Sequence, residues 1–340
     1  MRSWFSPHVS GYDHPRELST LHHRRRSFGR VFAACLSTIL FSISVISGHR
    51  TAKLIGGVEA NFWRLALATV FLSAWAFSVG KGISGAGFPH FLLSGLIGIG
   101  IGDAGLFQAL PRLGSRLSLL LMQCLTAPIA ALIEWLWLGT TLGPGPITGV
   151  VIILAGVAVA LVPGEHLTIP RPQLITGSLF ALVGALGNAL GVVLSRKAYA
   201  VTHANQETLD GGTAAFQRIL GGLLIAAIFL LIAKRQFMRL PGGTKSGSAP
   251  PSVRDKWRRI WPWVAMNSLA GQTLGVSCLQ WALETTPTGI VMSIVALTPL
   301  TVMPLARIFE GEKITARALI GGAIAVAGVV MLTLSRSAAD

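Results

Sequence analysis

The chain has 340 residues, of which 52% are hydrophobic and only 12% are charged. A soluble domain carries about 25% charged residues, so this composition excludes an ordinary soluble protein and predicts an integral membrane protein. The net charge of +15 does not indicate nucleic-acid binding, because the basic residues gather in the N-terminal tail and in loops, where lysine and arginine set topology and contact anionic lipid headgroups.

Residues 1–30 form a polar tail rich in arginine and histidine. The tail is longer than the basic start of a secretory signal, and the apolar run that follows it continues into further apolar segments. We therefore predict an uncleaved first helix from residue 31. The protein is expected in the inner or plasma membrane of the cell, with the lipid bilayer as its surroundings.

Ten segments are apolar over most of the roughly 20 residues that a membrane helix needs: 31–48, 62–79, 91–111, 117–138, 147–163, 174–195, 214–233, 261–283, 288–306 and 318–335. Most connections between them are short and rich in glycine, proline and charge. The connection 234–260 is longer, and we expect it to be mobile because it is too polar and proline-rich to pack. The sequence thus predicts an all-α membrane protein with ten transmembrane helices.

The second half of the chain repeats features of the first. The second span opens FWRLALA around Arg64, and the seventh opens FQRILGG around Arg218. Beyond the long connection 234–260, an Ala-Leu pair, a proline and a pair of glycines recur in order and at a nearly constant spacing: Ala109-Leu110 and Ala282-Leu283, Pro128 and Pro299, and Gly149/Gly156 and Gly321/Gly328. We call the spacing from Ala109 to Ala282 the repeat offset. Because five is odd, two five-helix copies, 31–163 and 174–335, must lie in opposite orientations.

These features resemble the EamA family of the drug/metabolite transporter superfamily over about residues 31–335. The resemblance includes a Gly-Glu turn before the last helix, Gly311-Glu312, although the first half has Gly139-Thr140 there. The resemblance implies a carrier with two inverted repeats around a central cavity, which exports amino acids, related polar metabolites or drugs by alternating access. Its third, fourth, eighth and ninth helices, with parts of the first, second, sixth and seventh, would line the cavity. A facilitative importer and a non-transporting partner or sensor subunit are the alternatives.

Arg64 and Arg218 are the first candidate site residues, because ionisable residues inside membrane spans mark functional sites by default. In one interpretation they line the cavity and attract an anionic or zwitterionic solute. In the other they lie close enough to the start of their spans to snorkel to the membrane surface.

Asp103 lies in the middle of the third span, in GIGIGDAGLFQAL. A carboxylate at that depth must be paired, hydrated or protonated. Asp103 is therefore the candidate for proton coupling, and the alternative is a structural ion pair with one of the arginines. The equivalent position in the second half, at the repeat offset, is Val276.

The remaining cavity candidates are polar or aromatic: Gln108, Gln272, Gln280, Trp63 and Trp281. Gln272 and Gln280 are separated by about two helical turns and so share a helix face. The two tryptophans are predicted either to form an apolar or cation–π wall or to anchor the helices at the membrane interface. Pro128 and Pro299 are candidates for bending the fourth and ninth helices.

All eight histidines lie outside the ten predicted spans, and no metal-ligand cluster lies within them. Intramembrane nucleophilic catalysis needs a histidine base within hydrogen-bonding reach, so we predict no catalytic residue, cofactor or metal site. The first helix and the family resemblance favour cytoplasmic termini. The excess of lysine and arginine in the loops that this orientation places outside favours the opposite.

Overall fold

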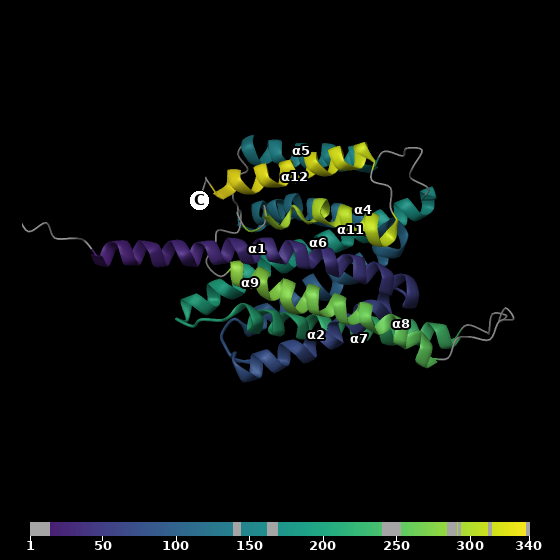
Figure 1. Ribbon diagram of the computed structural model, residues 1–340, viewed down its shortest axis with the longest axis horizontal. Helices are drawn as coiled ribbons and strands as arrows, with labels where there is room; N and C mark the ends of the chain where they lie inside the picture. The colour runs from purple at the N-terminus through teal and green to yellow at the C-terminus, as the bar shows by residue number, and fades with distance from the viewer. Residues whose placement is uncertain are drawn as a thin grey trace, which may run out of the picture.

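The computed structural model describes residues 14–138, 144–161, 169–239, 253–283, 291, 294–311 and 315–337. Within these residues every regular element is a helix (Figure 1). The elements are α1 (His14–Ile55), α2 (Gly57–Ser78), α3 (Phe88–Ser94), η1 (Gly95–Gly102), α4 (Asp103–Leu138), α5 (Pro144–Leu161), α6 (Arg171–Ala204), α7 (Gly211–Arg239), α8 (Val253–Asn267), η2 (Ser268–Gly275), α9 (Val276–Leu283), α11 (Thr298–Glu310) and α12 (Ala316–Ser337).

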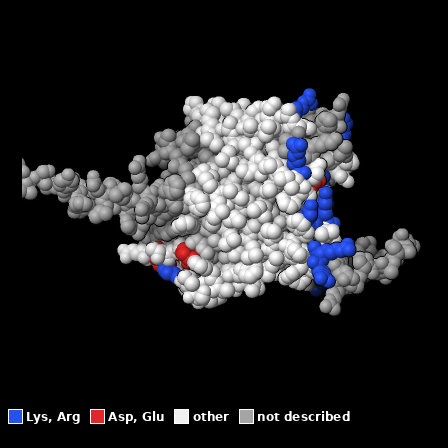
Figure 2. All heavy atoms as spheres, in the orientation of Figure 1, with Lys and Arg blue, Asp and Glu red and all other residues white. Residues whose placement is uncertain are grey.

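Five helical segments in this part of the chain are long and apolar enough to cross a membrane: Phe32–Ile55, Gly57–Ser78, Phe88–Ala130, Arg171–Ala204 and Gly211–Arg235. Two shorter apolar helices, Ile147–Val159 and Ala316–Leu332, accompany them. Figure 2 shows a broad uncharged surface on the face in view, with lysine and arginine gathered at the end where α8 begins. The molecule is therefore a multi-pass membrane protein.

The helices extend beyond the apolar segments that predicted them. α1 begins at His14, so residues 14–30 of the predicted tail are helical, and residues 1–13 lie outside the described residues. α7 continues to Arg239 and α8 begins at Val253, so that only 240–252 of the predicted loop 234–260 lie outside them. Lysine and arginine are good helix formers, and a helix therefore continues past the point at which its hydropathy falls.

A single long helical run covers the third and fourth predicted spans. It extends over 43 residues, Phe88–Ala130, and includes α3, η1 and most of α4. Gly114 alone has a non-helical backbone inside α4, with φ 80° and ψ 169°, a conformation that glycine adopts readily because it has no Cβ. Gly114 lies in the predicted connection between residues 111 and 117. The helix is therefore kinked at this connection and continues after it.

Two π-helices, η1 and η2, begin at Gly95 and Ser268. These two positions are separated by the repeat offset, which relates the third and eighth predicted spans. The sequence patterns did not predict the π-helices, since a π-helix depends on a local shift of backbone hydrogen bonds. π-helical turns are rare and occur frequently at functional sites, and their recurrence at equivalent positions supports an internal duplication.

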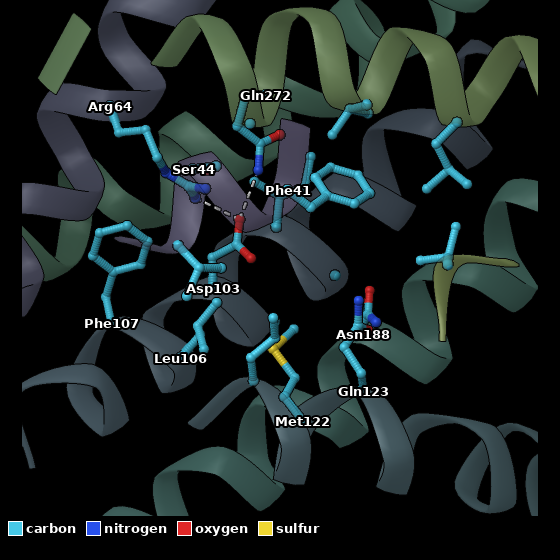
Figure 3. Close-up of a pocket in the computed structure, with 18 of the residues that line it drawn as sticks. Phe41, Ser44, Arg64, Asp103, Leu106, Phe107, Met122, Gln123, Asn188 and Gln272 are labelled. Atoms are coloured by element: carbon cyan, nitrogen blue, oxygen red, sulfur yellow. Dashed lines mark hydrogen bonds and ion pairs between the residues drawn. The ribbon is translucent and has the colours of Figure 1, made fainter. Parts of the chain in front are cut away.

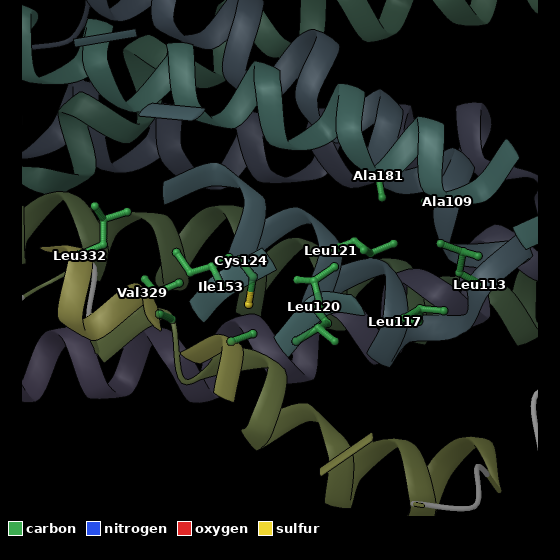
Figure 4. Packing of buried hydrophobic residues seen from close by; sticks show 13 residues of the cluster. Ala109, Leu113, Leu117, Leu120, Leu121, Cys124, Ile153, Ala181, Val329 and Leu332 are labelled. Carbon is green, nitrogen blue, oxygen red and sulfur yellow. The ribbon is translucent and has the colours of Figure 1, made fainter. Parts of the chain in front are cut away.

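The fifth and last helices, α5 and α12, pack side by side through their glycines (Figure 1). A Cβ atom at Gly149 would lie 2.8 Å from the backbone nitrogen of Leu332, and one at Gly328 would lie 2.7 Å from that of Ile153. Small residues at these positions let the two backbones approach, as is common between membrane helices. Ile153 and Leu332 join leucines of α4, including Leu120, in one buried apolar cluster (Figure 4).

α1 occupies the middle of the molecule. It packs against α2, α4, α8, η2, α9 and α11, while α2 packs on α7 and α4 on α6 (Figure 1). Both halves of the chain therefore meet around α1, and this arrangement positions the pocket.

Candidate functional site

A pocket of about 1010 Å³, including its open mouth, lies where the two halves meet. Its walls come from α1, α2, η1, α4, α6, α7, α8, η2 and α9, and they are mostly apolar. Among the described residues, the charged members of the lining are Arg64, Asp103 and Arg218. A mostly apolar pocket with a few converging polar groups is the usual form of a small-molecule site.

Arg64 of α2 and Asp103 of α4 form a buried ion pair. The Arg64 Nη2 donates to the Asp103 Oδ2 at 2.6 Å and to the Asn61 Oδ1 at 2.8 Å. Asn61 lies one helical turn before Arg64, so both face the same side of α2. The guanidinium carbon also lies 4.7 Å from the centre of the Phe107 ring, within cation–π range. Charge, hydrogen bonds and ring together hold the Arg64 guanidinium in one position.

Gln272 of η2 completes this cluster from the other half of the chain. Its Nε2 donates to the same Asp103 Oδ2 at 3.0 Å. Figure 3 shows Arg64 and Gln272 converging on one carboxylate oxygen, while the other oxygen takes part in neither interaction. Asp103 thus joins α2 and α4 of the first half to η2 of the second half.

Arg218 of α7 is held by η1 and by a hydroxyl. A Cβ atom at Gly95 would lie 1.7 Å from the carbonyl oxygen of Arg218, so glycine alone allows η1 to lie this close to α7. The Arg218 Nε donates to the Ser94 Oγ at 3.0 Å, and the Ser94 Oγ in turn donates to the Gly191 carbonyl at 2.7 Å. Ser94 also lies 2.8 Å from the Ser195 Oγ.

Neither arginine snorkels out of the protein. Arg64 is 4% exposed and Arg218 is 6% exposed, and both line the pocket. Both side chains are therefore enclosed by the protein at the pocket. Asp103, at 8% exposure, is paired with Arg64, as the structural alternative for that residue expects.

The other predicted residues fall into two groups. Gln272 and Gln280 line the pocket, and Gln280 is buried with no hydrogen-bond partner for either amide atom among the described residues. The described lining does not include Gln108, Trp63 or Trp281. The amide oxygen of Gln108 accepts from Arg112, and Trp63 packs edge-on against Trp257 with ring centres 5.2 Å apart. Trp281 is 46% exposed.

The two prolines differ in position. Pro128 lies inside α4, where a missing backbone N–H leaves a carbonyl without its helical donor. Pro299 lies in the first turn of α11, where that donor would be unused, and residues 296–297 just before α11 form a turn within the predicted ninth span. Gly311 ends α11 with a left-handed backbone, φ 69°, and Glu312, Gly139 and Thr140 lie outside the described residues.

Sequence reasoning missed several polar residues around the pocket. Asn61, Ser94 and the Ser44–Asn267 pair, whose Oγ and Oδ1 atoms lie 2.7 Å apart, were not singled out. One signal was available: Ser94 and Asn267 are separated by the repeat offset, and each immediately precedes a π-helix.

The placement of His49 corrects the prediction that every histidine lies outside the spans. α1 continues to Ile55, and His49 is buried in the apolar segment Phe32–Ile55. Its Nδ1 lies 2.7 Å from the Oε1 of Glu310, whose Oε2 accepts from the Ser115 hydroxyl at 2.8 Å. The predicted span ended at residue 48 because the polar residues that follow lower its hydropathy, although tertiary contacts bury this part of the helix.

Comparison with known proteins places the chain in a family. The model of the EamA-like transporter family matches residues 29–162 and again 175–334. A solved structure titled "Crystal structure of protein" has a TM-score of 0.57 at 18% identity, covering 89% of this chain and 96% of that chain, and shares the fold. No curated protein matches. The two family matches cover most of the sequence and confirm the resemblance, and the chain thus belongs to the EamA-like transporter family of the drug/metabolite transporter superfamily.

Proposed function

We propose that the protein is a ten-helix carrier, built from two inverted five-helix repeats, that moves small organic solutes across the cell membrane by alternating access. The observation that carries this proposal is the Asp103 cluster, in which Arg64 and Asp103 belong to the first repeat and Gln272 to the second. Alternating access requires contacts between repeats that form and break around one site. The cluster is a contact between the repeats, and Arg64, Asp103 and Gln272 all line the pocket.

Two features of the backbone support the inverted repeats. η1 and η2 recur at the repeat offset, and Gly114 interrupts α4 where a third span would end and a fourth would begin. An odd number of helices in each repeat then makes the second copy run opposite to the first.

Asp103 is our candidate for proton coupling. Protonation would remove the charge that holds Arg64 and weaken the acceptor of Gln272, and so would loosen the contact between the repeats. The test is the pH dependence of solute flux in proteoliposomes. We expect flux in the wild type to change with the imposed proton gradient and flux in Asp103→Asn to be independent of it. An equal response of both proteins would assign Asp103 a structural role.

We further propose export, with amino acids and related small metabolites as the first candidates for cargo. The experiment compares the culture media of cells that carry the intact protein, its Arg64→Ala/Asp103→Asn variant, or an empty vector, by mass spectrometry. Metabolites enriched only by the intact protein would identify the cargo and tie it to the pocket. Identical media, with both proteins present in the membrane, would contradict export and favour uptake or a partner-subunit role.

We propose that the protein lies in the cell membrane with both termini in the cytoplasm. Figure 2 shows most of the basic side chains that it colours at the end of the molecule opposite to the one where α12 ends (Figure 1), so the positive-inside rule, applied to the described residues, favours the reverse orientation. A fluorescent protein that folds only in the cytoplasm, fused to the C-terminus, decides between them. Fluorescence supports the proposed orientation, and its absence with intact membrane insertion overturns it.

A further inference from the structure

The equivalent arginines of the two halves, Arg64 and Arg218, have different neighbours. Asp103 immediately follows η1, and Val276, at the repeat offset from it, immediately follows η2. In the first half the carboxylate neutralises Arg64 at 2.6 Å. The second half carries a valine at the equivalent position and cannot neutralise Arg218 in the same way.

Val276 nevertheless lies beside the helix that carries Arg218. It packs in one buried cluster with Ala215, Phe216 and Ile219 of α7, and both Val276 and Arg218 line the pocket. Val276 therefore lies next to the helix of its arginine, as Asp103 does in the first half, but it carries a hydrocarbon in place of an acid.

Arg218 forms no ion pair with a described residue. Among the described residues, its hydrogen-bond partner is the Ser94 hydroxyl, which occupies Nε. Tyr199 and Asp103 both act on Arg218 electrostatically, but the Asp103 carboxylate is bound to Arg64. An arginine stays protonated in proteins, and a buried charge without a counter-ion is costly. With two guanidinium groups and one carboxylate in its described lining, the pocket has a formal excess of one positive charge.

The uncharged residues that line the pocket indicate which other groups the solute carries. The amide of Gln280 is buried with its donor and acceptor both unpartnered among the described residues. The surrounding wall is apolar and includes Phe41, Leu106 and Val295. One cation, one neutral amide and a hydrocarbon wall fit a solute with one anionic end and an apolar body.

We propose that the cargo is a carboxylate with an apolar body and a net negative charge, and that its carboxylate pairs with Arg218 as the counter-ion that the second repeat lacks. This inference rests on the carrier function proposed above and narrows its cargo from amino acids and related metabolites to those with a net negative charge. A zwitterion of the same body brings no net charge and therefore leaves the excess charge of the pocket in place.

The test measures binding to the full-length protein in nanodiscs by isothermal titration calorimetry. The probes are propionate, octanoate and 3-phenylpropionate, each with its neutral amide, together with L-phenylalanine as a zwitterion. We expect at least one carboxylate to bind about tenfold or more tightly than its amide, because a hydrogen bond to a charged group contributes that much. Failure of every carboxylate to exceed its amide, or tighter binding of the zwitterion than of 3-phenylpropionate, overturns the proposal.

Two pairs of variants assign the effect to Arg218. Val276→Asp supplies the missing carboxylate and is expected to weaken carboxylate binding by about tenfold, whereas the uncharged and similarly sized Val276→Asn retains it. Arg218→Gln is expected to abolish the preference for acid over amide, and Arg218→Lys to preserve it. Unchanged preference in both Val276→Asp and Arg218→Gln overturns the proposal.

Flux of the same probes in proteoliposomes separates this inference from the carrier function. Charge-dependent binding without flux supports the anion site and contradicts a carrier. Flux without a preference for the carboxylate over its amide supports a carrier and contradicts the anion site.

Discussion

The two π-helices occupy equivalent places in the two halves, yet their neighbourhoods differ. η1 begins at Gly95, which lies against the backbone of Arg218, and is followed by Asp103. η2 begins at the fully buried Ser268 and is followed by Val276. The difference teaches that the duplicated backbone tolerates unlike side chains. One half uses an acid to neutralise its arginine, while the other leaves a cation facing the pocket.

Removal of the acid in the first half should have the largest effect. Asp103→Leu leaves the buried Arg64 without its counter-ion and is expected to lower the free energy of unfolding by about 3–5 kcal/mol. The measurement is denaturant unfolding in mixed micelles. The double variant Arg64→Met/Asp103→Leu should recover most of the loss, and a double variant no more stable than Asp103→Leu would show that the pair is unimportant for stability.

The contact between the halves is expected to be weaker than the ion pair. Gln272→Leu removes a hydrogen bond to the Asp103 carboxylate and should cost about 1.5–3 kcal/mol in the same assay. Ile99, the equivalent position in η1 by the repeat offset, is the matched control, because Ile99→Leu exchanges one hydrocarbon for another at a cost below about 1.5 kcal/mol. Equal losses in both variants would indicate packing rather than hydrogen bonding.

Substitution of the first residue of each π-helix tests the backbone approach. Gly95→Ala places a methyl group against the Arg218 carbonyl and is expected to destabilise the protein by about 1–3 kcal/mol. Ser268→Ala at the equivalent position should change stability by less, since the Ser268 hydroxyl has no hydrogen-bond partner among the described residues. A Gly95→Ala variant as stable as Ser268→Ala would show that η1 is free to shift away from α7.

Substitution of Asp210, a carboxylate outside the spans, is expected to have the smallest effect on stability. Burial raises the pKa of Asp210, but hydrogen bonds from Thr213, Trp75 and Gly212 outweigh it and lower the pKa below the ordinary value. A lowered pKa stabilises the fold above the unfolded-state value of about 3.9, and this stability is lost as the pH falls through the folded-state pKa. Asp210→Asn should therefore flatten the loss of stability below about pH 4, as measured by thermal unfolding. An unchanged slope would contradict this.

The sequence predicts the charged residues of the pocket better than the uncharged residues of its walls. Arg64, Asp103 and Arg218 are recognisable because charge is costly within apolar spans, and all three converge in the structure. Trp63 and Trp281 were predicted as pocket candidates but do not line the pocket. The sequence could not show this, because a helix that is apolar all round carries no periodic signal to separate its lipid-facing side from its interior side.

Other features depend on tertiary contacts. Gly95 at the start of η1 lies against the Arg218 carbonyl, and nothing in the local composition distinguishes this glycine from the others in GLIGIGIG. His49 follows a hydropathy boundary and is buried by its neighbours rather than by its own segment. Sequence patterns therefore locate helices and costly charges, whereas packing determines which residues face each other.

Solute flux into proteoliposomes that contain the purified protein tests the central claim most directly. A solute enriched in the medium of expressing cells would be supplied in radiolabelled form to vesicles with the wild type, the Arg64→Ala/Asp103→Asn variant, or no protein. The account predicts saturable uptake with the wild type and uptake at the protein-free level with the variant. Equal uptake by the wild type and the variant, above the protein-free level, would contradict transport through this pocket.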